Sequence, residues 1–216
     1  MTDLLDRFGH IAIEGPIGVG KSSLARRLGQ HLGAELLLEK AEENPFLERF
    51  YRDPRAHAFQ TQLFFLFQRV QQMQEVVQTG MFSRGIVSDF FFDKDALFAR
   101  MNLDDEEYRL YAQIQAHMAK AFPRPGLIVW LQAQPATLIE RIRRRGIAME
   151  QGMDEAYLSR LCDAYVEHFR AHEGAAVLTV VTEDFNPAGR DDDFARLLAH
   201  LETFEGPRGV FDPAAP

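Results

Sequence analysis

The sequence has almost no cysteine and no long apolar run. Cys162 is the only cysteine among 216 residues, so no disulfide can form within the chain, and we expect a reducing, cytoplasmic environment. No apolar run approaches the roughly 18 residues of a membrane-spanning helix. The N-terminal residues include two acids and lack the apolar core of a secretory signal. We therefore expect no membrane partner.

Positive charge is also scarce. The chain has 24 Lys and Arg against 32 Asp and Glu, a formal net charge of -8. Binding a nucleic acid requires a surplus of cations, so we expect no nucleic-acid partner, whereas a small anionic ligand is compatible with this charge. The length and the 46% of apolar residues fit one folded domain. We expect that domain over residues 1–204 and a flexible tail over 205–216, where Pro and Gly leave little to pack.

Short apolar runs alternate with helical patterns along the chain, which indicates an α/β fold with a parallel sheet. Several runs are apolar at consecutive positions, as is typical of strands covered by helices on both faces. We therefore predict a five-stranded parallel sheet flanked by helices on both faces. The expected strands are His10–Glu14, Leu36–Glu39, Ile86–Asp89, Leu127–Leu131 and Val177–Val181, and the expected helices are Ser22–Leu32, Arg55–Gln78, one from Asp104 to before Pro123, Pro135–Arg145, Asp154–His172 and Asp191–Phe204.

Residues 15 to 22 read Gly-Pro-Ile-Gly-Val-Gly-Lys-Ser, a full match to the phosphate-loop pattern G-x-x-x-x-G-K-[ST]. A strand precedes the loop and a helix follows, so loop amides and the positive helix end can converge on the β- and γ-phosphates of a nucleotide. A glycine-rich turn without a ligand is the weaker alternative. We expect ATP to bind through Gly15, Pro16, Ile17, Gly18, Val19, Gly20, Lys21, Ser22 and Ser23, with the Ser22 hydroxyl as a Mg²⁺ ligand.

Two acids close the second and third expected strands. Ligands of open parallel sheets bind beyond the carboxyl ends of the strands, where Glu39 and Asp89 fall. Glu39 can take the proton of an attacking hydroxyl group, and Asp89 can hold magnesium. Either acid alone is equally compatible with a solvated strand end or a helix cap. Together with the loop they favour phosphoryl transfer.

Gln62 and Arg69 lie seven residues apart in one expected helix and are nearly eclipsed. Such a pair can read the edge of a purine through bidentate hydrogen bonds. The alternative is two polar side chains at the border of a core.

Several arginines gather at the end of the helix expected over Pro135–Arg145. Cations there complement the helix dipole, which is a purely structural explanation. Arginines on a flexible lid would instead stabilise the charge of a transferred phosphoryl group, and their number favours this interpretation. They are Arg141, Arg143, Arg144 and Arg145.

Five segments resemble the deoxynucleoside kinase family, especially its bacterial deoxyadenosine and deoxyguanosine kinases. They are IAIEGPIGVGKS at 11 to 22, EENPFLERFY at 42 to 51, FQTQLFFLFQR at 59 to 69, VSDFFFDKD at 87 to 95 and ERIRRRG at 140 to 146. The resemblance implies a five-stranded parallel sheet with a short Arg-rich lid, ATP and Mg²⁺ as cofactors, and a homodimer.

The resemblance also implies the role of each site residue. Glu39 is expected to be the general base for the nucleoside 5′-hydroxyl, and Lys21, Arg141 and Arg145 to contact the phosphates. Asp89 would take the acid position of the family's acid-Arg-Ser motif. Base recognition is expected from Gln62, Arg69, Asp95 and Phe98, and recognition of the sugar 3′-hydroxyl from Tyr51 and Glu150.

The chain departs from the family pattern at Lys40, Phe90, Ile147 and Met149, where many members have Pro, Arg, Arg and an acid. Phe90 resembles the deoxyguanosine branch, whereas Gln62 resembles the deoxyadenosine branch. We predict ATP-dependent phosphorylation of the 5′-hydroxyl of a purine deoxynucleoside. The alternatives are a nucleoside monophosphate kinase of the thymidylate type and a non-catalytic nucleotide-binding partner subunit.

Overall fold

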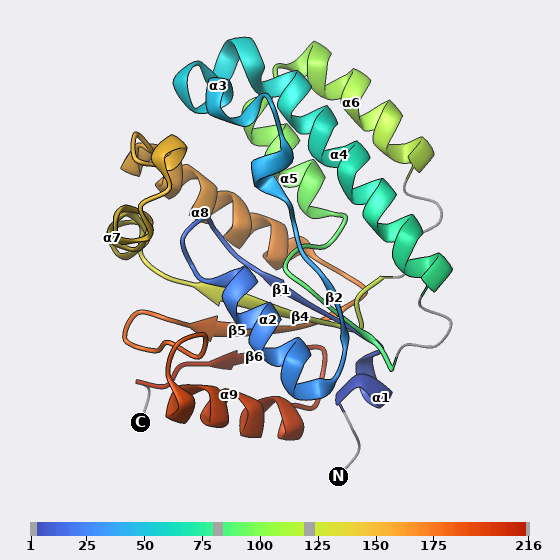
Figure 1. Cartoon of the computed structure of the whole chain (residues 1–216), viewed down its shortest axis with the longest axis vertical. Coiled ribbons are helices and arrows are strands. Elements are labelled where there is room, and N and C mark those ends of the chain that lie inside the picture. Colours follow the sequence, from blue (N-terminus) through green and yellow to red (C-terminus); the bar gives the residue numbers. More distant parts are fainter. Residues whose placement is uncertain (1–3, 80–83, 119–123, 215–216) are drawn as a thin grey trace.

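The computed structural model of the chain describes residues 4–79, 84–118 and 124–214. Within these residues six strands form one parallel sheet in the order β2-β3-β1-β4-β5-β6 (Figure 1). The predicted α/β class and parallel sheet are confirmed, and the number of strands is six instead of five. The strands are β1 (His10–Glu14), β2 (Glu35–Leu37), β3 (Ile86–Ser88), β4 (Leu127–Gln132), β5 (Ala176–Val181) and β6 (Arg208–Phe211).

The helices expected from the apolar patterns all form, with small shifts at their ends. The end expected before Pro123 for the helix that begins near Asp104 lies outside the described residues. The short helices α1, α3 and α5 were not expected. The helices are α1 (Leu4–Phe8), α2 (Lys21–Leu32), α3 (Leu47–Arg52), α4 (Pro54–Thr79), α5 (Lys94–Asn102), α6 (Asp105–Met118), α7 (Pro135–Arg145), α8 (Glu155–Ala171) and α9 (Asp191–Thr203), with 3-10 turns η1 (Ala41–Glu43) and η4 (Ala148–Glu150).

Strand β6 corrects the expectation of a loose tail from Glu205. It pairs in parallel with β5, with Val177 opposite Arg208 and Val180 opposite Phe211. The Phe211 ring also stacks on His200 of α9, with 4.6 Å between centroids. The Pro and Gly content did not predict this strand, because the edge of β5 presents a row of backbone donors and acceptors. A short segment can pair with that row whatever its side chains are.

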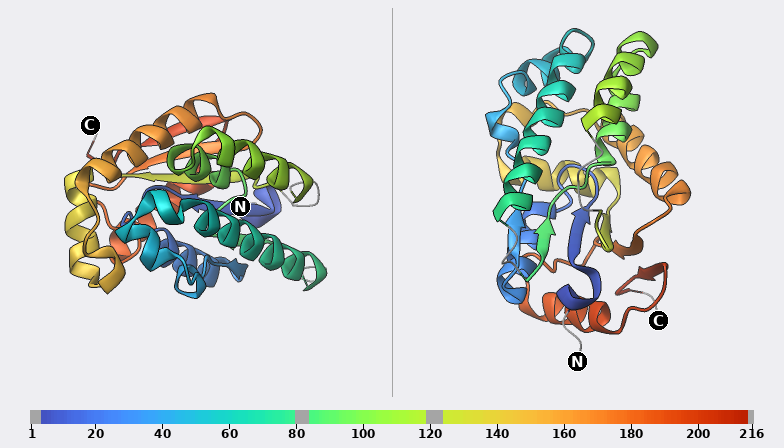
Figure 2. Two further views of the ribbon diagram at one scale, coloured as in Figure 1. Left: turned by 90° about the horizontal axis from the view of Figure 1, so that it is seen from above. Right: turned by 90° about the vertical axis from the view of Figure 1, so that its right-hand side faces the viewer.

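Helices cover the sheet on both faces, and Figure 2 shows α2 and α8 on opposite sides of it. Helix α2 approaches β2 so closely that a Cβ on Gly29 would lie 2.4 Å from the Leu36 side chain. It also adjoins α9, because the Arg27 guanidinium carbon lies 4.3 Å from the Phe194 ring centroid. On the other face Phe169 of α8 packs against Trp130 of β4. The strands are therefore buried from both sides, as their apolar runs predicted.

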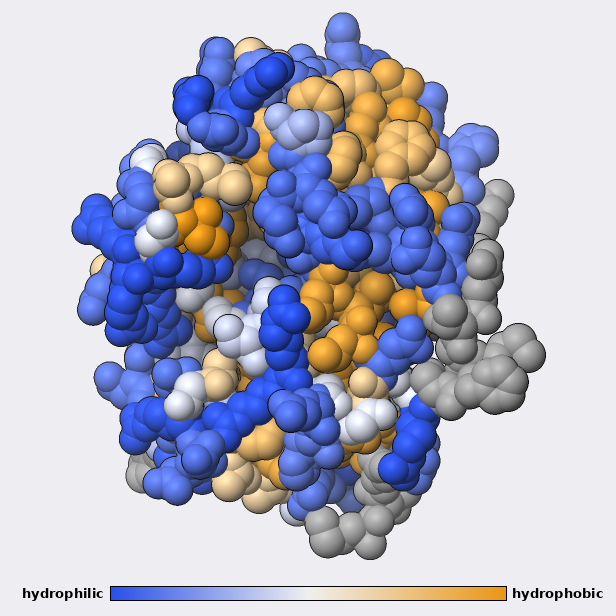
Figure 3. Space-filling model, in the orientation of Figure 1, coloured by the Kyte–Doolittle hydropathy of each residue, from blue (hydrophilic) through white to orange (hydrophobic). Residues whose placement is uncertain are grey.

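Helices α3, α4 and α6 gather at the end of the molecule away from α9 (Figure 1). With α5 they enclose a second apolar cluster that includes Phe50, Leu66 and Tyr111. A space-filling view shows apolar residues exposed over α4 and α6 (Figure 3), where Phe67 is 51% and Leu110 49% accessible to solvent. None of the helices in the described parts of the chain combines the length and the apolarity that crossing a bilayer requires.

Candidate functional site

The glycine-rich loop connects β1 to α2, as predicted from its pattern. Gly15, Gly18 and Gly20 have φ of +142°, +87° and +104°, a region that other residues rarely adopt. A Cβ on Gly15 would lie 2.4 Å from the Leu131 carbonyl oxygen, and one on Gly18 would lie 2.8 Å from Cγ1 of Ile142. Glycine is therefore required at both positions, because the loop is packed tightly between β4 and α7.

Two cavities flank this loop, and Gly18 contributes to both. The Glu39 cavity, of about 290 Å³, lies between the loop and helices α3 to α5. The Arg141 cavity, of about 420 Å³, lies between the loop, α7 and the segment after β5. Predicted residues that line the Glu39 cavity are Ile17, Gly18, Lys21, Ser22, Glu39, Tyr51, Gln62, Arg69, Asp89, Phe98, Arg145 and Glu150, and those that line the Arg141 cavity are Gly18, Val19, Gly20, Ser23 and Arg141.

Lys21 lies over the loop at the first position of α2. Its Nζ donates to the carbonyl oxygens of Gly15 and Pro16, at 2.8 and 3.0 Å. Burial, reinforced by repulsion from Lys94, lowers the pKa of Lys21 to about 8. A cation held in this way favours a bound anion, because an anion relieves both the desolvation and the repulsion.

Asp89 joins the loop to the end of β2. One carboxylate oxygen accepts a hydrogen bond from the Ser22 hydroxyl, and the other accepts one from the backbone N–H of Glu39 at 2.7 Å. Hydroxyl and carboxylate oxygens suit Mg²⁺, which takes few protein ligands and completes its octahedron with water and phosphate oxygens. Ser22 and Asp89 therefore fit the predicted metal role. Among the described residues no three His, Cys, Asp or Glu side chains are arranged so that they could hold a metal ion by themselves.

Glu39 faces its cavity between several cations. It forms ion pairs with Arg69 and Lys94, whose Nζ lies 3.5 Å from Oε2. Burial by itself would raise the pKa of Glu39, but Lys94, Arg69 and Lys21 together outweigh it and lower the pKa to about 2. The carboxylate is therefore ionised at neutral pH, and its side chain is 19% exposed toward the cavity.

Arg69 is fixed by anions on two sides. Besides Glu39 it pairs with Asp95, which is fully buried and does not line the cavity. The help in selecting the base that the resemblance implies for Asp95 would therefore act through Arg69. Gln62 and Arg69 do line the same cavity, as their helical spacing predicted.

The arginines of the predicted lid separate into two sites. Arg145 lines the Glu39 cavity and forms an ion pair with Glu150. Tyr51 lies beside this pair, and burial together with the Glu150 charge raises the pKa of its hydroxyl. Ile147 lines the cavity where the family pattern has arginine.

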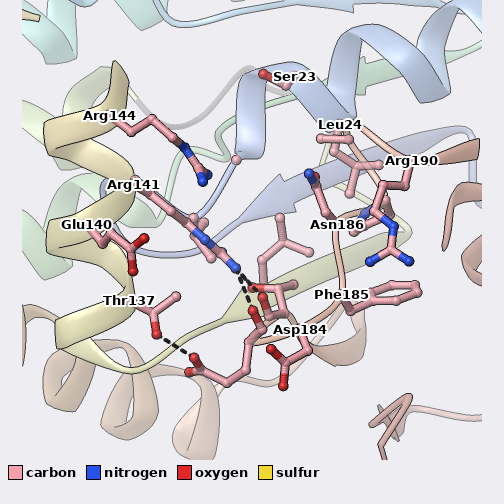
Figure 4. Close-up of a pocket in the computed structure, with 18 residues that line it drawn as sticks. Ser23, Leu24, Thr137, Glu140, Arg141, Arg144, Asp184, Phe185, Asn186 and Arg190 are labelled. Carbon is pink, nitrogen blue, oxygen red and sulfur yellow. Dashed lines mark hydrogen bonds between the residues drawn. The ribbon is translucent and has the colours of Figure 1, made fainter. Parts of the chain in front are cut away.

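Arg141 points into the other cavity, where it donates to the carbonyl oxygens of Thr182 and Glu183 (Figure 4). The segment after β5 that forms this wall was not predicted. Its place at the carboxyl end of a parallel strand was the available signal, as for Glu39 and Asp89. Arg144, another of the predicted lid arginines, also lines this cavity, and the newly identified lining residues include Asp184, Phe185, Asn186 and Arg190.

Two further buried charges were missed. Glu14 is fully buried at the end of β1 and accepts hydrogen bonds from the backbone N–H groups of Gly15 and Phe91 and from the Tyr165 hydroxyl, at 3.0 to 3.2 Å. Burial raises the pKa of Glu14. Lys94, at the start of α5, is 3% exposed and lines the Glu39 cavity. An acid that closes an apolar strand was a signal for Glu14, whereas Lys94 had only its place in the VSDFFFDKD segment.

Known proteins resemble the chain in sequence and in fold. A family model described as deoxynucleoside kinase matches residues 11–204. A deoxyguanosine kinase of Bacillus subtilis (strain 168) is 32% identical over 198 residues, covering 89% of this chain and 95% of that protein. A deoxyadenosine/deoxycytidine kinase of the same organism is 28% identical over 199 residues, covering 88% and 90%. The structure of deoxyadenosine kinase from M. mycoides with bound dATP shares the fold, with a TM-score of 0.74 and 24% identity over 90% of this chain and all of that one. The chain therefore belongs to the deoxynucleoside kinase family.

Proposed function

We propose that the protein transfers the γ-phosphoryl group of ATP to the 5′-hydroxyl group of a purine deoxynucleoside. The observation that carries this proposal is the ionised Glu39 carboxylate facing a cavity that Lys21 and Ser22 of the phosphate loop also line. A hydroxyl group in that cavity can lie between a carboxylate and a phosphoryl group held at the mouth of α2. The similarity to a deoxyguanosine kinase over 95% of its length supports a purine as the base.

In the proposed reaction the 5′-oxygen forms a bond to the γ-phosphorus as the bond from that phosphorus to the bridging β–γ oxygen breaks. ADP leaves, and the hydroxyl proton passes to Glu39. With a pKa of about 2 Glu39 is a weak base, so it orients the hydroxyl and takes the proton only as the new bond makes that oxygen more acidic. Such a late transfer suits the loose transition state of phosphoryl groups.

The remaining groups act through charge and position. Lys21 and Arg145 neutralise charge on the phosphates. Ser22 and Asp89 would hold Mg²⁺, which when bound neutralises phosphate charge. We place the donor nucleotide in the Arg141 cavity, whose flat guanidinium and Phe185 suit a purine ring, and the deoxynucleoside in the Glu39 cavity beside Gln62 and Phe98.

The direct test supplies the purified protein with ATP, MgCl₂ and each of the four deoxynucleosides, and in parallel with the four deoxynucleoside monophosphates. Formation of dGMP or dAMP from the unphosphorylated nucleoside is the expected result. Turnover of monophosphates alone would favour a kinase of the thymidylate type. No turnover at all would favour a non-catalytic subunit.

Replacing Glu39 tests the proposed base. Glu39→Gln is expected to lower kcat at least about 100-fold because the amide cannot accept the proton, with little change in ATP affinity. Glu43→Gln is the matched control, since this exposed acid pairs with Lys40 outside the cavity. Normal turnover by Glu39→Gln would exclude the role.

The homodimer implied by the resemblance also remains a proposal. The exposed apolar area over α4 and α6 that includes Phe67 and Leu110 is a candidate contact (Figure 3). Sedimentation velocity at micromolar concentration would measure the oligomeric state.

A further inference from the structure

The chain has an apolar residue where many family members have an arginine near the reacting groups. Phe90 is 1% exposed and packs in a small apolar cluster with Leu37, Met73 and Ile86. It does not line the Glu39 cavity. The reaction proposed above still places a highly charged phosphoryl group at that end of the cavity, so another cation on the acceptor side has to stabilise it.

Among the buried cations that line this cavity, Lys94 has the fewest hydrogen-bond and ion-pair partners. An ammonium group has three donors and is rarely fully buried unless paired. Among the described residues Lys94 has one side-chain partner within ion-pair distance, Oε2 of Glu39 at 3.5 Å, and its charge also partly offsets the effect of burial on the pKa of Glu14. Its Nζ lies 5.5 Å from the centroid of the Phe98 ring, which lines the same cavity.

The other buried cations of the cavity are held more firmly, and Arg26, which also lines it, is exposed to solvent. Arg69 is fixed between Glu39 and Asp95. Arg145 pairs with Glu150, and Lys21 donates to two loop carbonyl oxygens. Glu39 can therefore keep Arg69 as its counter-ion while Lys94, on a flexible stem, turns to another anion.

We propose that Lys94 is a further catalytic residue, whose ammonium group contacts the transferred phosphoryl group from the acceptor side and supplies the charge that Phe90 cannot. The inference rests on the proposed function. As the 5′-oxygen bonds to the γ-phosphorus and the bond to the bridging oxygen breaks, the equatorial oxygens carry the developing charge. Lys94 and Lys21, which both line the cavity, stabilise that charge together. Lys94 stays protonated, and the hydroxyl proton goes to Glu39.

Kinetics of Lys94→Gln test the proposal, because glutamine keeps a hydrogen bond to Glu39 and removes the charge. We expect kcat to fall about 100-fold, the size of effect seen for groups that contact a developing anion, while both KM values change less than about threefold. Lys94→Arg should retain most of the rate. Lys40→Gln is the matched control, since this exposed lysine pairs with Glu43 outside the cavity. A kcat of Lys94→Gln close to that of wild type would overturn the proposal.

A second measurement separates contact with the phosphoryl group from support of Glu39. If Lys94 acted only by holding Glu39, adding Lys94→Gln to Glu39→Gln would cost no further activity, and that result would overturn the catalytic role. We expect a further loss of about tenfold or more. Circular dichroism checks that each variant is folded.

Binding supplies a readout without turnover. ADP with aluminium fluoride and the deoxynucleoside mimics the transferred group, and Lys94→Gln should bind this combination far more weakly while it binds ADP alone like wild type. If Lys94→Gln and wild type bound the combination of ADP, aluminium fluoride and deoxynucleoside with equal affinity, that result would also overturn the role. A failure of the proposed function can be distinguished from a failure of this inference, because the wild-type protein itself would then phosphorylate no deoxynucleoside. The role of Lys94 would be refuted in that case as well.

Discussion

Replacing Asp95 with asparagine is expected to destabilise the fold by about 3 kcal/mol. Asp95 has no exposed surface, and the Arg69 side chain with which it pairs is 4% exposed. Removing one partner of a buried ion pair costs roughly 3–5 kcal/mol, because the other charge is left desolvated. Arg69 keeps Glu39 as a second anion, so we expect the lower end of that range.

Urea unfolding of the two proteins measures this difference. For a slope of about 3 kcal/mol per molar urea, the midpoint should fall by about 1 M. Glu167→Gln is the matched control, because it makes the same chemical change in a pair whose side chains are 68% and 69% exposed, and such pairs contribute only about 0–1 kcal/mol. Equal losses in the two variants would refute the reasoning that burial makes the Arg69–Asp95 pair important.

Two other substitutions test the loop. The pKa of Lys21, lowered from 10.5 to about 8, means that the unfolded chain binds more protons between these values, so stability of the ligand-free protein should rise with pH across that window. Lys21→Met removes the cost of burying this charge, so it should raise Tm at pH 7 while abolishing turnover. A lower Tm of the variant in a thermal scan would show that the buried charge does not destabilise the protein. Gly18→Ala should lower both Tm and ATP affinity, because its Cβ would meet Ile142 at 2.8 Å, whereas Gly33→Ala, with positive φ but open space, should lose only about 1 kcal/mol and no affinity.

Local patterns predicted the parts of the site that depend on chain direction. Continuous apolar runs gave the strands, and parallel strands bring their carboxyl ends to one edge, so Glu39 and Asp89 meet at the loop. Helical spacing placed Gln62 and Arg69 in one cavity. Strand β6 escaped prediction because its four residues have no apolar run and form a strand only by pairing with the free edge of β5.

Charge pairing could not be read from the sequence in the same way. Periodicity predicts the direction in which Arg69 points, but its partners Glu39 and Asp95 come from a strand end and another helix, and only the packed fold brings them together. The same holds for Arg141 and Arg145, which are four residues apart on one helix and yet enter different cavities. Arg141 donates to the segment after β5, whereas Arg145 at the end of α7 pairs with Glu150, so neighbouring side chains acquire different partners.

These pairs also bear on how a chain of net charge -8, in which four arginines cluster near the end of α7, can hold a triphosphate. In the Glu39 cavity Arg69, Lys94 and Arg145 each have an acid as partner. A phosphate group that contacts these three cations has to compete with their carboxylates and exchanges one ion pair for another, whereas Lys21 and Arg26, which also line the cavity, form no ion pair among the described residues. Such an exchange favours ligands that present an anion at the right place, and it disfavours a long polyanion, which gains only where free cations line an open surface. The negative overall charge and the phosphate-binding function are therefore compatible.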